Sequence, residues 1–592
     1  MEIQVVKIGR FYILWQENYN RWLTSDCLTK EAYDYLKNMP DHEKKERFWT
    51  SLSFGTGGLR AKMGLGTNCM NIFTVSKAAS GMADYIFQNQ KEGKEQGVAI
   101  AYDSRHHSYE FAEAAACALA AKGITAYLFR DMRPTPLLSF AVRFLNLSGG
   151  IVITASHNPP EYNGFKAYGS DGAQFSSFAA EQLAACIENI KDELLLKTDS
   201  KEEYIRTGKI LILDDLIDHA YLQTLDALRF CKTEEIDRNV SVVFTSLHGT
   251  AITLFPHLME RNGFTNIHLV KEQCVPNGDF PTVEVPNPEV KAAFSQAILK
   301  AKKVKADLVI ACDPDADRLG IVVRNLQGTY EYLSGNQIAA LCVNYLIQQR
   351  RKNQILFPNG TLIDTIVSSP FAAAIATAHG LKHMRTPIGF KYIAERIHVL
   401  EKDASTQFFM GYEESYGYLF LDAVRDKDAF QASLILTEMA AYYKKQNKSL
   451  LEVLQQLYEK YGYFNEETES IMFSGWEGMK KIEQIMAVFY ALDIPGFFGD
   501  YEVLYMEDYL EQKVKFPDGT TEILSGFPKV PMIRLIFVHD AWLAVRPSGT
   551  EPKIKFYYGV KEASYTKTLE KIQELKSWLH HLLKKSGIEI GH

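Results

Sequence analysis

Three aspartates stand at alternate positions in the segment DLVIACDPDADRLGIVV, directly after an apolar run. Asp313, Asp315 and Asp317 would repel one another at this spacing, and a bound cation would relieve the repulsion. Carboxylate oxygens suit Mg²⁺, and three of them leave an octahedral ion room for a phosphate oxygen. The loop is no EF-hand, because Arg318 and Arg324 stand where that motif needs glycine and glutamate. The segment predicts a Mg²⁺ site, with a solvated acidic turn as the alternative.

A second polar loop follows another apolar run, in the stretch GGIVITASHNPPEYNGFK. Ser156 and His157 come after the expected strand, and Pro159 and Pro160 keep the loop from winding into a helix. Loops at the carboxyl ends of strands are where α/β sheets hold their ligands. Ser156 lacks the Gly-x-Ser-x-Gly elbow of an α/β-hydrolase. The stretch predicts a nucleophilic serine, and a capped turn is the alternative.

Two later segments carry groups suited to a sugar and to a phosphate. GYEESYGYLF places Glu413 and Ser415 between glycines, where they can bind sugar hydroxyls; an exposed acidic turn is the alternative. RPSGTEPKIKFYYG offers a guanidinium, hydroxyls and backbone N–H groups, which together form a phosphate cradle; a plain hairpin turn is the alternative. The residues of the cradle are Arg546, Ser548, Gly549 and Thr550. Since the sequence contains no G-x-x-x-x-G-K-[ST] motif, nucleotide hydrolysis of the P-loop type is not indicated.

Composition limits the remaining classes of function. The chain has 592 residues, too many for one hydrophobic core, and this length predicts about three to five domains. A net charge of -7, with both signs spread along the chain, argues against a general nucleic-acid binder and a basic membrane-surface protein. Eight scattered cysteines without C-x-x-C pairs indicate reduced thiols and a cytoplasmic location. No stretch approaches the ~20 apolar residues of a spanning helix, and no signal-peptide pattern is present.

The elements that must position these loops alternate between strand and helix. Apolar runs separated by helical patterns recur in three rounds, which is typical of βαβ units. The strands expected in these rounds are 98–102, 125–129, 150–154, 240–245, 267–270, 307–312, 361–367 and 407–410. The expected helices are 109–122, 137–145, 251–262, 289–303, 371–379 and 390–400. The last part differs, because short strands precede one long amphipathic helix; these elements are 532–538, 541–545, 554–560 and 562–585.

These patterns predict three consecutive α/β domains with mixed sheets, followed by a C-terminal α+β domain of antiparallel sheet and helices. The predicted domains are 1–215 with the serine loop, 216–327 with the metal loop, 328–455 with the sugar loop and 456–592 with the phosphate loop. Linkers are expected near 205–235, 325–330 and 450–500. Since each domain supplies one loop, we expect the four domains to surround a central cleft that binds a phosphorylated sugar.

Together the four loops resemble those of the α-D-phosphohexomutase superfamily, which includes phosphoglucomutases and phosphomannomutases. TASHNP resembles its phosphoserine loop, DPDADR its metal loop, EES its sugar loop and RPSGT its phosphate loop, in the same order from about residue 45 to about residue 570. FGTGGLR, NGFK and TPIGFK resemble further family segments and nominate Arg60, Lys166 and Lys391. YDSRHHS and SLHGTA also match family segments, with expected architectural roles. In one departure, Tyr412 stands where family members often carry glycine.

The resemblance implies an isomerase of glucose metabolism that interconverts α-D-glucose 1-phosphate and glucose 6-phosphate. Ser156 would rest as phosphoserine and share a Mg²⁺ ion with the aspartates, and glucose 1,6-bisphosphate would be the intermediate and activator. The phosphate cradle would bind the non-reacting phosphate, while Glu413 and Ser415 hold the sugar. The cations expected to offset phosphate charge are Arg60, Lys166 and Arg318, and Lys391, in a segment that resembles the family's specificity loop, is expected to bind the substrate. Lys166 is the first candidate for the general base, and His157 is the alternative, positioning the serine loop.

Several activities remain open at this stage. The chain is longer than many bacterial relatives, as in a subgroup that includes phosphoglucomutases, phosphopentomutases and glucose 1,6-bisphosphate synthases. Phosphomannomutase, phosphopentomutase, bisphosphate synthase or phosphatase activity would use the same loops, and a non-enzymatic sugar-phosphate sensor is a further class. The expected partners are small-molecule sugar phosphates, without nucleic acid or membrane, and the expected state is a monomer or weak homodimer.

Overall fold

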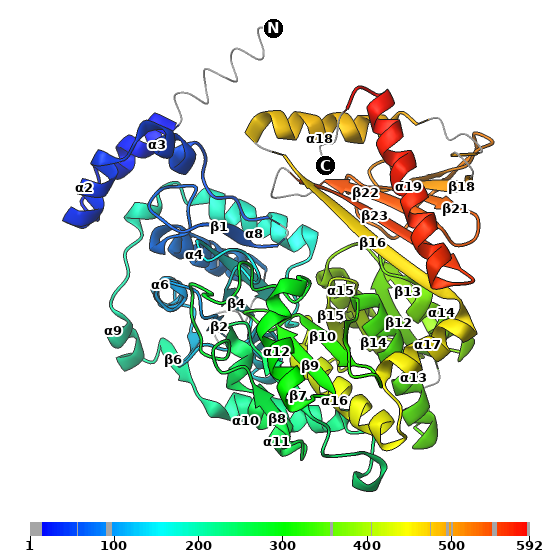
Figure 1. The fold of residues 1–592 in the computed structure, drawn as a ribbon. Helices are drawn as coiled ribbons and strands as arrows, with labels where there is room; N and C mark the ends of the chain where they lie inside the picture. The colour runs from blue at the N-terminus through cyan, green and yellow to red at the C-terminus, as the bar shows by residue number, and fades with distance from the viewer. Residues whose placement is uncertain are drawn as a thin grey trace. The chain divides into compact units, whose positions relative to one another are not determined.

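A computed structural model describes residues 15–55, 57–89, 97–355, 359–403, 405–473, 475–492, 497–498, 501–547 and 553–588 (Figure 1). The chain divides into two compact units. The first consists of Met1–Gly335, Gln349–Phe357 and Phe390–Ser449, and the second of Asn336–Gln348, Pro358–Gly389 and Leu450–His592. Each unit is described in turn.

The first unit begins with a six-stranded mixed sheet in the order β1-β5-β4-β2-β3-β6. Its strands are β1 (Leu59–Lys62), β2 (Val98–Tyr102), β3 (Ala126–Phe129), β4 (Gly149–Ile153), β5 (Tyr162–Gly169) and β6 (Ile210–Leu213). Parallel pairs join β4, β2, β3 and β6, whereas β5 runs antiparallel to β4 and β1. Every residue of β2 and β4 is buried, which explains why these strands are continuous apolar runs in the sequence.

Helices flank this sheet and build its core. They are α4 (Ile72–Asn89), α6 (Ser108–Ala121), α7 (Thr135–Phe144), α8 (Ser177–Asn189), α9 (Lys201–Arg206) and α10 (Asp215–Thr224). Helix α4 packs against both α6 and α8, and the three share one buried apolar cluster with the strands. The earlier helices α2 (Lys30–Asn38) and α3 (Asp41–Phe48) belong to a separate cluster around Trp22 and Phe48.

A second mixed sheet follows in the same unit, in the order β11-β10-β9-β7-β8. Its strands are β7 (Val242–Thr245), β8 (Ile267–Leu269), β9 (Leu308–Cys312), β10 (Leu319–Arg324) and β11 (Tyr330–Tyr332). Two predicted helices start later than expected, since short 3₁₀ turns precede α11 (Phe255–Arg261) and α12 (Ser295–Val304). Pro256 lies in the first turn of α11, where its missing N–H is tolerated.

The third α/β part contributes elements to both units. The first unit contains α15 (Phe390–Glu401), the antiparallel pair β14 (Gln407–Glu413) and β15 (Gly417–Leu419), and α16 (Ala429–Lys445). The second unit contains the parallel pair β12 (Gly360–Thr365) and β13 (Lys382–Thr386), with α14 (Pro370–Ala378) and α17 (Leu450–Tyr461). Residues of α13 (Gly335–Lys352) fall in both units.

The rest of the second unit is an antiparallel sheet in the order β16-β23-β22-β21-β18-β19-β20, with β17 paired to β18. Its strands are β16 (Tyr463–Met472), β17 (Phe497–Phe498), β18 (Tyr501–Asp508), β19 (Lys513–Lys515), β20 (Thr521–Ile523), β21 (Ile533–Phe537), β22 (Trp542–Pro547) and β23 (Lys553–Glu562). Leu543 and Val545 share a core with α18 (Gly475–Tyr490) and α19 (Tyr565–Lys585), while Trp542 and Ala544 belong to another cluster. This alternation shows that the sheet buries both faces. Figure 1 shows α18 and α19 lying over the strands.

The predicted fold class is confirmed: three α/β domains with mixed sheets precede an antiparallel sheet with helices. Two predicted linkers were wrong. Segment 205–235 contains β6 and α10, and segment 450–500 contains α17, β16 and α18. β6 has only four residues, too few for its periodicity to identify it. None of the described helices is long and apolar enough to cross a membrane, and the described part, which includes all eight cysteines, contains no disulfide.

Candidate functional site

The three aspartates predicted as metal ligands lie together. One carboxylate oxygen from each of Asp313, Asp315 and Asp317 lies within 4.8 Å of the others, and all three side chains are buried. Their loop follows β9, so it lies at the carboxyl end of a buried strand. Asp315 Oδ1 and Asp317 Oδ1 are buried without a hydrogen-bond partner among the described residues. Buried charged oxygens without partners are costly, and a divalent cation would satisfy them.

Lysines offset part of this negative charge. Lys166, on β5, places Nζ 2.6 Å from Asp315 Oδ2 and 3.1 Å from Asp317 Oδ2. Burial alone would lower the pKa of Lys166, but the two aspartates outweigh it and raise that pKa, so the side chain is held as a cation. Burial and the two neighbouring carboxylates raise the pKa of Asp313 well above its ordinary value. Burial opposes ionisation of Asp317 as well, but Lys166 and Lys427 overcome it and lower the pKa of that carboxyl.

Ser156 meets the aspartates directly. It follows β4, and its Oγ donates a hydrogen bond of 2.7 Å to Asp313 Oδ2. Its backbone φ of 51° is left-handed, a conformation that costs about 1–2 kcal/mol for a residue with a Cβ. The Ser156 N–H donates to Thr154 Oγ1 at 2.8 Å, which helps to hold this conformation. The serine and metal loops, predicted in different domains, therefore form one site.

Arg105 binds the backbone of the serine loop. Its buried guanidinium donates hydrogen bonds to four carbonyl oxygens of the loop, those of Ser156, Asn158, Pro159 and Tyr162. Asp103 Oδ2 lies 3.4 Å from Arg105 Nε and balances the buried charge. One side chain thus fixes both ends of the loop, in agreement with the architectural role expected for this segment.

His157, Arg318 and Arg60 surround the serine. His157 Nδ1 lies 3.3 Å from Ser156 Oγ, and burial together with Arg318 and Arg60 lowers the pKa of the imidazole well below its ordinary value. The Arg318 N–H donates to Asp313 Oδ1 at 3.0 Å, while its guanidinium pairs with Glu289. Arg60, on β1, donates to Asn158 Oδ1 at 2.9 Å.

Lys427 links the metal loop to the sugar loop, and the sequence analysis did not single it out. Its Nζ lies 3.3 Å from Asp317 Oδ2, 3.1 Å from Asp426 Oδ1 and 4.0 Å from Glu413 Oε2. Burial raises the pKa of Glu413. A lysine between two aspartates in the segment RDKDAF was the signal that could have identified it.

The metal loop is also braced by two threonines that sequence reasoning missed. Thr135 begins α7, and it donates its N–H to the Asp315 carbonyl at 2.9 Å and its hydroxyl to Asp315 Oδ2 at 2.8 Å. Thr250 donates both its N–H and its hydroxyl to the Pro314 carbonyl, at 2.7 and 2.9 Å. A Cβ on Gly249 would lie 2.2 Å from Pro314 Cα, so only glycine permits this approach. No periodic pattern marks contacts between such distant segments.

Other predicted site residues lie elsewhere or outside the described residues. Lys391, on α15, donates to Ser177 Oγ at 3.2 Å rather than to a residue of the metal or serine loop. Ser415 is half-buried in the turn between β14 and β15, and this turn joins the metal loop through Leu319 N–H and Tyr416 O at 3.0 Å. Arg546 lies on β22 in the second unit. Ser548, Gly549 and Thr550 lie outside the described residues.

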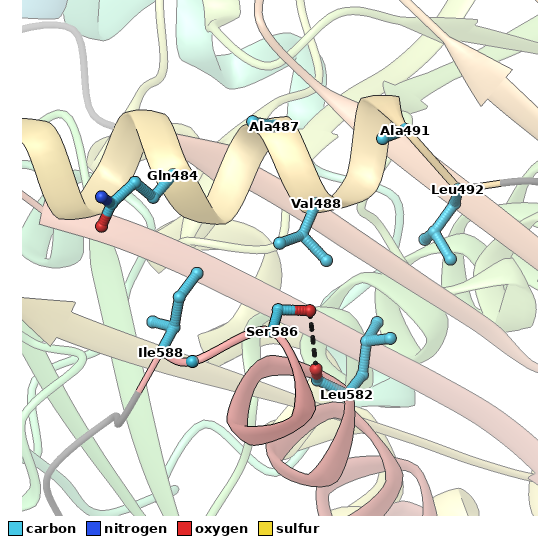
Figure 2. Close-up of a pocket in the computed structure, with 9 residues that line it drawn as sticks. Gln484, Ala487, Val488, Ala491, Leu492, Leu582, Ser586 and Ile588 are labelled. Atoms are coloured by element: carbon cyan, nitrogen blue, oxygen red, sulfur yellow. Dashed lines mark hydrogen bonds between the residues drawn. The ribbon is translucent and has the colours of Figure 1, made fainter.

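The second unit contains a separate cavity of about 650 Å³ between α18 and the end of α19 (Figure 2). It is lined by Gln484, Ala487, Val488, Ala491, Leu492, Leu582, Ser586, Gly587 and Ile588. The Ser586 hydroxyl already donates to the Leu582 carbonyl at 3.1 Å. None of the lining residues within the described part of the chain is charged, so these residues offer no cation to a phosphate, unlike the site around Ser156.

The fold and this donor set define a class: an α/β protein with a serine beside a buried cluster of three aspartates at the carboxyl ends of its strands. Three family models match the chain. They describe phosphoglucomutase/phosphomannomutase α/β/α domains I, II and III and match residues 51–194, 219–328 and 334–461. Phosphoglucomutase from Staphylococcus aureus (strain MSSA476) is 39% identical over 565 residues, which span 95% of this chain and 98% of that protein. The chain therefore belongs to the phosphoglucomutase/phosphomannomutase family.

Solved structures share the fold. A phosphoglucomutase/phosphomannomutase family protein from Burkholderia thailandensis has a TM-score of 0.65 at 19% identity, covering 92% of this chain and 99% of that one. The open form of parafusin, a phosphoglucomutase from Paramecium, has a TM-score of 0.64 at 19% identity, covering 91% and 96%. At 19% identity, these similarities show a shared fold and carry no conclusion about function.

Proposed function

We propose that this chain interconverts α-D-glucose 1-phosphate and glucose 6-phosphate through a phosphoserine at Ser156 and a glucose 1,6-bisphosphate intermediate. The observation that carries the proposal is the 2.7 Å hydrogen bond between Ser156 Oγ and Asp313 within the buried aspartate cluster. It joins a nucleophile to the acidic residues that can hold a cation. Relatives named phosphoglucomutase that align over 95% of the chain support glucose as the sugar.

Mg²⁺ is the cofactor that the donor set fits best. Asp313, Asp315 and Asp317 offer only oxygen ligands, and two of their buried oxygens have no hydrogen-bond partner within the described part of the chain. When bound, Mg²⁺ would withdraw charge from phosphorus and stabilise the phosphoryl oxygens in the transition state.

The chain's own residues position the reacting groups. The free hydroxyl of the sugar attacks phosphorus and loses its proton, its new O–P bond replaces the bond to Ser156 Oγ, and the serine oxygen gains a proton. We propose that Lys166, which two aspartates hold as a cation, donates a proton to the serine oxygen and, once neutral, accepts the proton of the sugar hydroxyl. His157, 3.3 Å from Ser156 Oγ, positions the serine. Arg318 and Arg60 offset the phosphate charge.

The bisphosphate must then present its other phosphate to Ser156. Glu413 and Ser415 are proposed to hold sugar hydroxyls in both poses, with Lys427 beside Glu413. Lys391 is proposed to contact the sugar phosphate. The phosphate cradle of Arg546, Ser548, Gly549 and Thr550 is proposed to hold whichever phosphate does not react. The partners are small sugar phosphates, and we propose a cytoplasmic location.

The test combines mass and turnover. Intact-mass measurement after incubation with glucose 1,6-bisphosphate should show molecules heavier by one phosphate, and the purified enzyme should convert glucose 1-phosphate when Mg²⁺ is present. Relative kcat/KM on glucose, mannose and ribose 1-phosphates separates the alternative mutases. Release of inorganic phosphate identifies a phosphatase, and phosphoryl transfer from a glycolytic bisphosphate identifies a synthase. A chain that gains no phosphate and turns over none of these sugars would contradict the proposal.

A further inference from the structure

Strand β6 is the last strand of the first sheet, so one of its sides is an open edge. It pairs in parallel with β3, and no strand of the described chain pairs with its other side. The carbonyls of Lys209 and Leu213 accept hydrogen bonds from Ala126 and Arg130, on and just after β3. Alternate residues of a parallel strand bond to the same neighbour, so the N–H and C=O groups of Ile210 and Ile212 point outward. A row of backbone donors and acceptors is thus available for pairing.

The side chains at this edge are apolar and exposed. Leu211 is 41% and Ile212 37% exposed, whereas all residues of β2 and β4 in the same sheet are buried. Ile205 on α9 and Leu216 on α10 are 40% and 66% exposed on the elements directly before and after the strand. We call Leu211 and Ile212 the edge patch.

The edge also lacks the usual protection against pairing. Proteins commonly blunt an open edge with an inward-pointing charge, a proline or a bulge within the strand. β6 is the uninterrupted run Ile210–Leu213. Its charges stand only at the ends: Lys209 precedes the strand, and Asp214 and Asp215 follow it, and all three are exposed. Asp214 also caps α10 by accepting the Leu216 N–H, and Asp215 lies 3.4 Å from Arg133, with its side chain still 80% exposed.

This distribution of charge is complementary to itself in the antiparallel direction. When two copies of β6 pair antiparallel across a twofold axis, Lys209 of each copy lies beside the end of the other strand, near the partner's Asp214 and Asp215. In a parallel arrangement, like charges would meet instead. Because the N–H and C=O groups of Ile210 and Ile212 point outward, the two strands pair with Ile210 of one chain opposite Ile212 of the other. In this register the twofold axis passes between the two copies of Leu211, which lie opposite each other.

We propose that β6 is a homodimer interface, through which two copies of this chain join their first sheets edge to edge. The pairing would add about four backbone hydrogen bonds and cover the edge patch on both copies. The second copy is the occupant because the end charges of this strand match an antiparallel copy of itself. The inference concerns domain I alone and does not depend on the proposed catalytic function.

Sedimentation velocity and light scattering on the full chain test the proposal. The wild-type chain should form dimers as its concentration rises. Ile212→Lys should weaken association at least about 10-fold, because it places two lysines at the pairing edge. Leu299→Lys is the matched control, since Leu299 is a 61% exposed leucine on α12, and it should leave the dimer intact. Lys209→Asp should also weaken the dimer, and adding Asp215→Lys should restore it.

A cross-link tests the register. Leu211 lies opposite its own copy in a non-hydrogen-bonded pair, where Cα atoms are about 4.5 Å apart and a disulfide can form. Leu211→Cys should therefore cross-link two chains under mild oxidation, whereas Leu299→Cys should not. Circular dichroism confirms that each variant folds. A chain that stays monomeric at all concentrations, a dimer that Ile212→Lys leaves unchanged, or a dimer without the Leu211→Cys cross-link would overturn the proposal.

Discussion

The hydrogen bond from Thr135 to Asp315 gives the sharpest prediction about the proposed metal site. Thr135 Oγ1 and Lys166 Nζ both contact Asp315 Oδ2, at 2.8 and 2.6 Å, whereas Asp315 Oδ1 is buried without a hydrogen-bond partner in the described chain. The two donors thus hold one oxygen and leave the other available to a cation. Thr135→Val keeps the branched shape and the backbone N–H bond but removes the hydroxyl.

The expected loss follows from the worth of that bond. A hydrogen bond to a charged group contributes about 1.5–3 kcal/mol. At about 1.4 kcal/mol per factor of ten, its loss would weaken metal binding about 10- to 100-fold, the range typical of residues that orient a metal ligand. The loss should appear mainly in the Mg²⁺ concentration needed for half-maximal activity, and saturating Mg²⁺ should recover most of the turnover.

Calorimetry with Mg²⁺, and electron paramagnetic resonance with Mn²⁺, measure the affinity without relying on activity. Thr250→Val is the matched control, because Thr250 braces the same loop through the Pro314 carbonyl and not through a carboxylate. Thermal unfolding without metal shows whether either variant is merely unstable. If Thr135→Val binds metal as tightly as the wild-type chain, the reasoning about Asp315 is refuted; if the wild-type chain binds no divalent cation, the proposed metal site itself fails.

Three further predictions concern the nucleophile, the buried lysine and a buried aspartate. Ser156→Ala should gain no phosphate by intact mass and lose turnover by about 10⁴-fold or more; near-normal turnover with glucose 1,6-bisphosphate supplied would reject the nucleophile. Lys427→Met should destabilise the metal-free chain by about 3–5 kcal/mol in urea unfolding, since it removes a buried cation shared by Asp317, Asp426 and Glu413 and leaves Lys166 alone to pair with Asp317, and Mg²⁺ should recover part of the loss; an unchanged midpoint would contradict this. Burial raises the pKa of Asp428 from 3.8, its ordinary value, to about 6 in the folded chain. The contribution of Asp428 to the free energy of unfolding is therefore fully present below pH 3.8 and is lost as the pH rises through about 6. Because the Tyr221 hydroxyl donates to the Asp428 carboxylate, Tyr221→Phe should cost about 1.5–3 kcal/mol above pH 6 and less below pH 4, and a cost independent of pH would argue against this pairing.

Much of the candidate site could be predicted because its loops are local in sequence. A buried strand followed by a polar loop is visible in a short window, and this identified Ser156 after β4 and the aspartates after β9. The alternation of strand and helix likewise gave the order of the α/β domains. The prediction was wrong for elements whose apolar residues show no clear repeat. The main example is β6, whose four residues were predicted to lie in a linker. Short segments carry too little periodicity to be separated from loops.

The sequence by itself determined which chemistry was present: a serine, three aspartates and a set of cations, each at the end of an expected element. Only the tertiary structure decided which side chains meet. Ser156 binds Asp313, Thr135 turns the Asp315 carboxylate, and Lys427 bridges Asp317 and Glu413, although these partners lie far apart along the chain. Contacts of this kind depend on how strands order themselves within a sheet and how sheets pack, and no local pattern encodes that order. The open edge of β6 is also a feature that only the tertiary structure decides, because a strand has an unpaired edge only when the order of strands in its sheet is set.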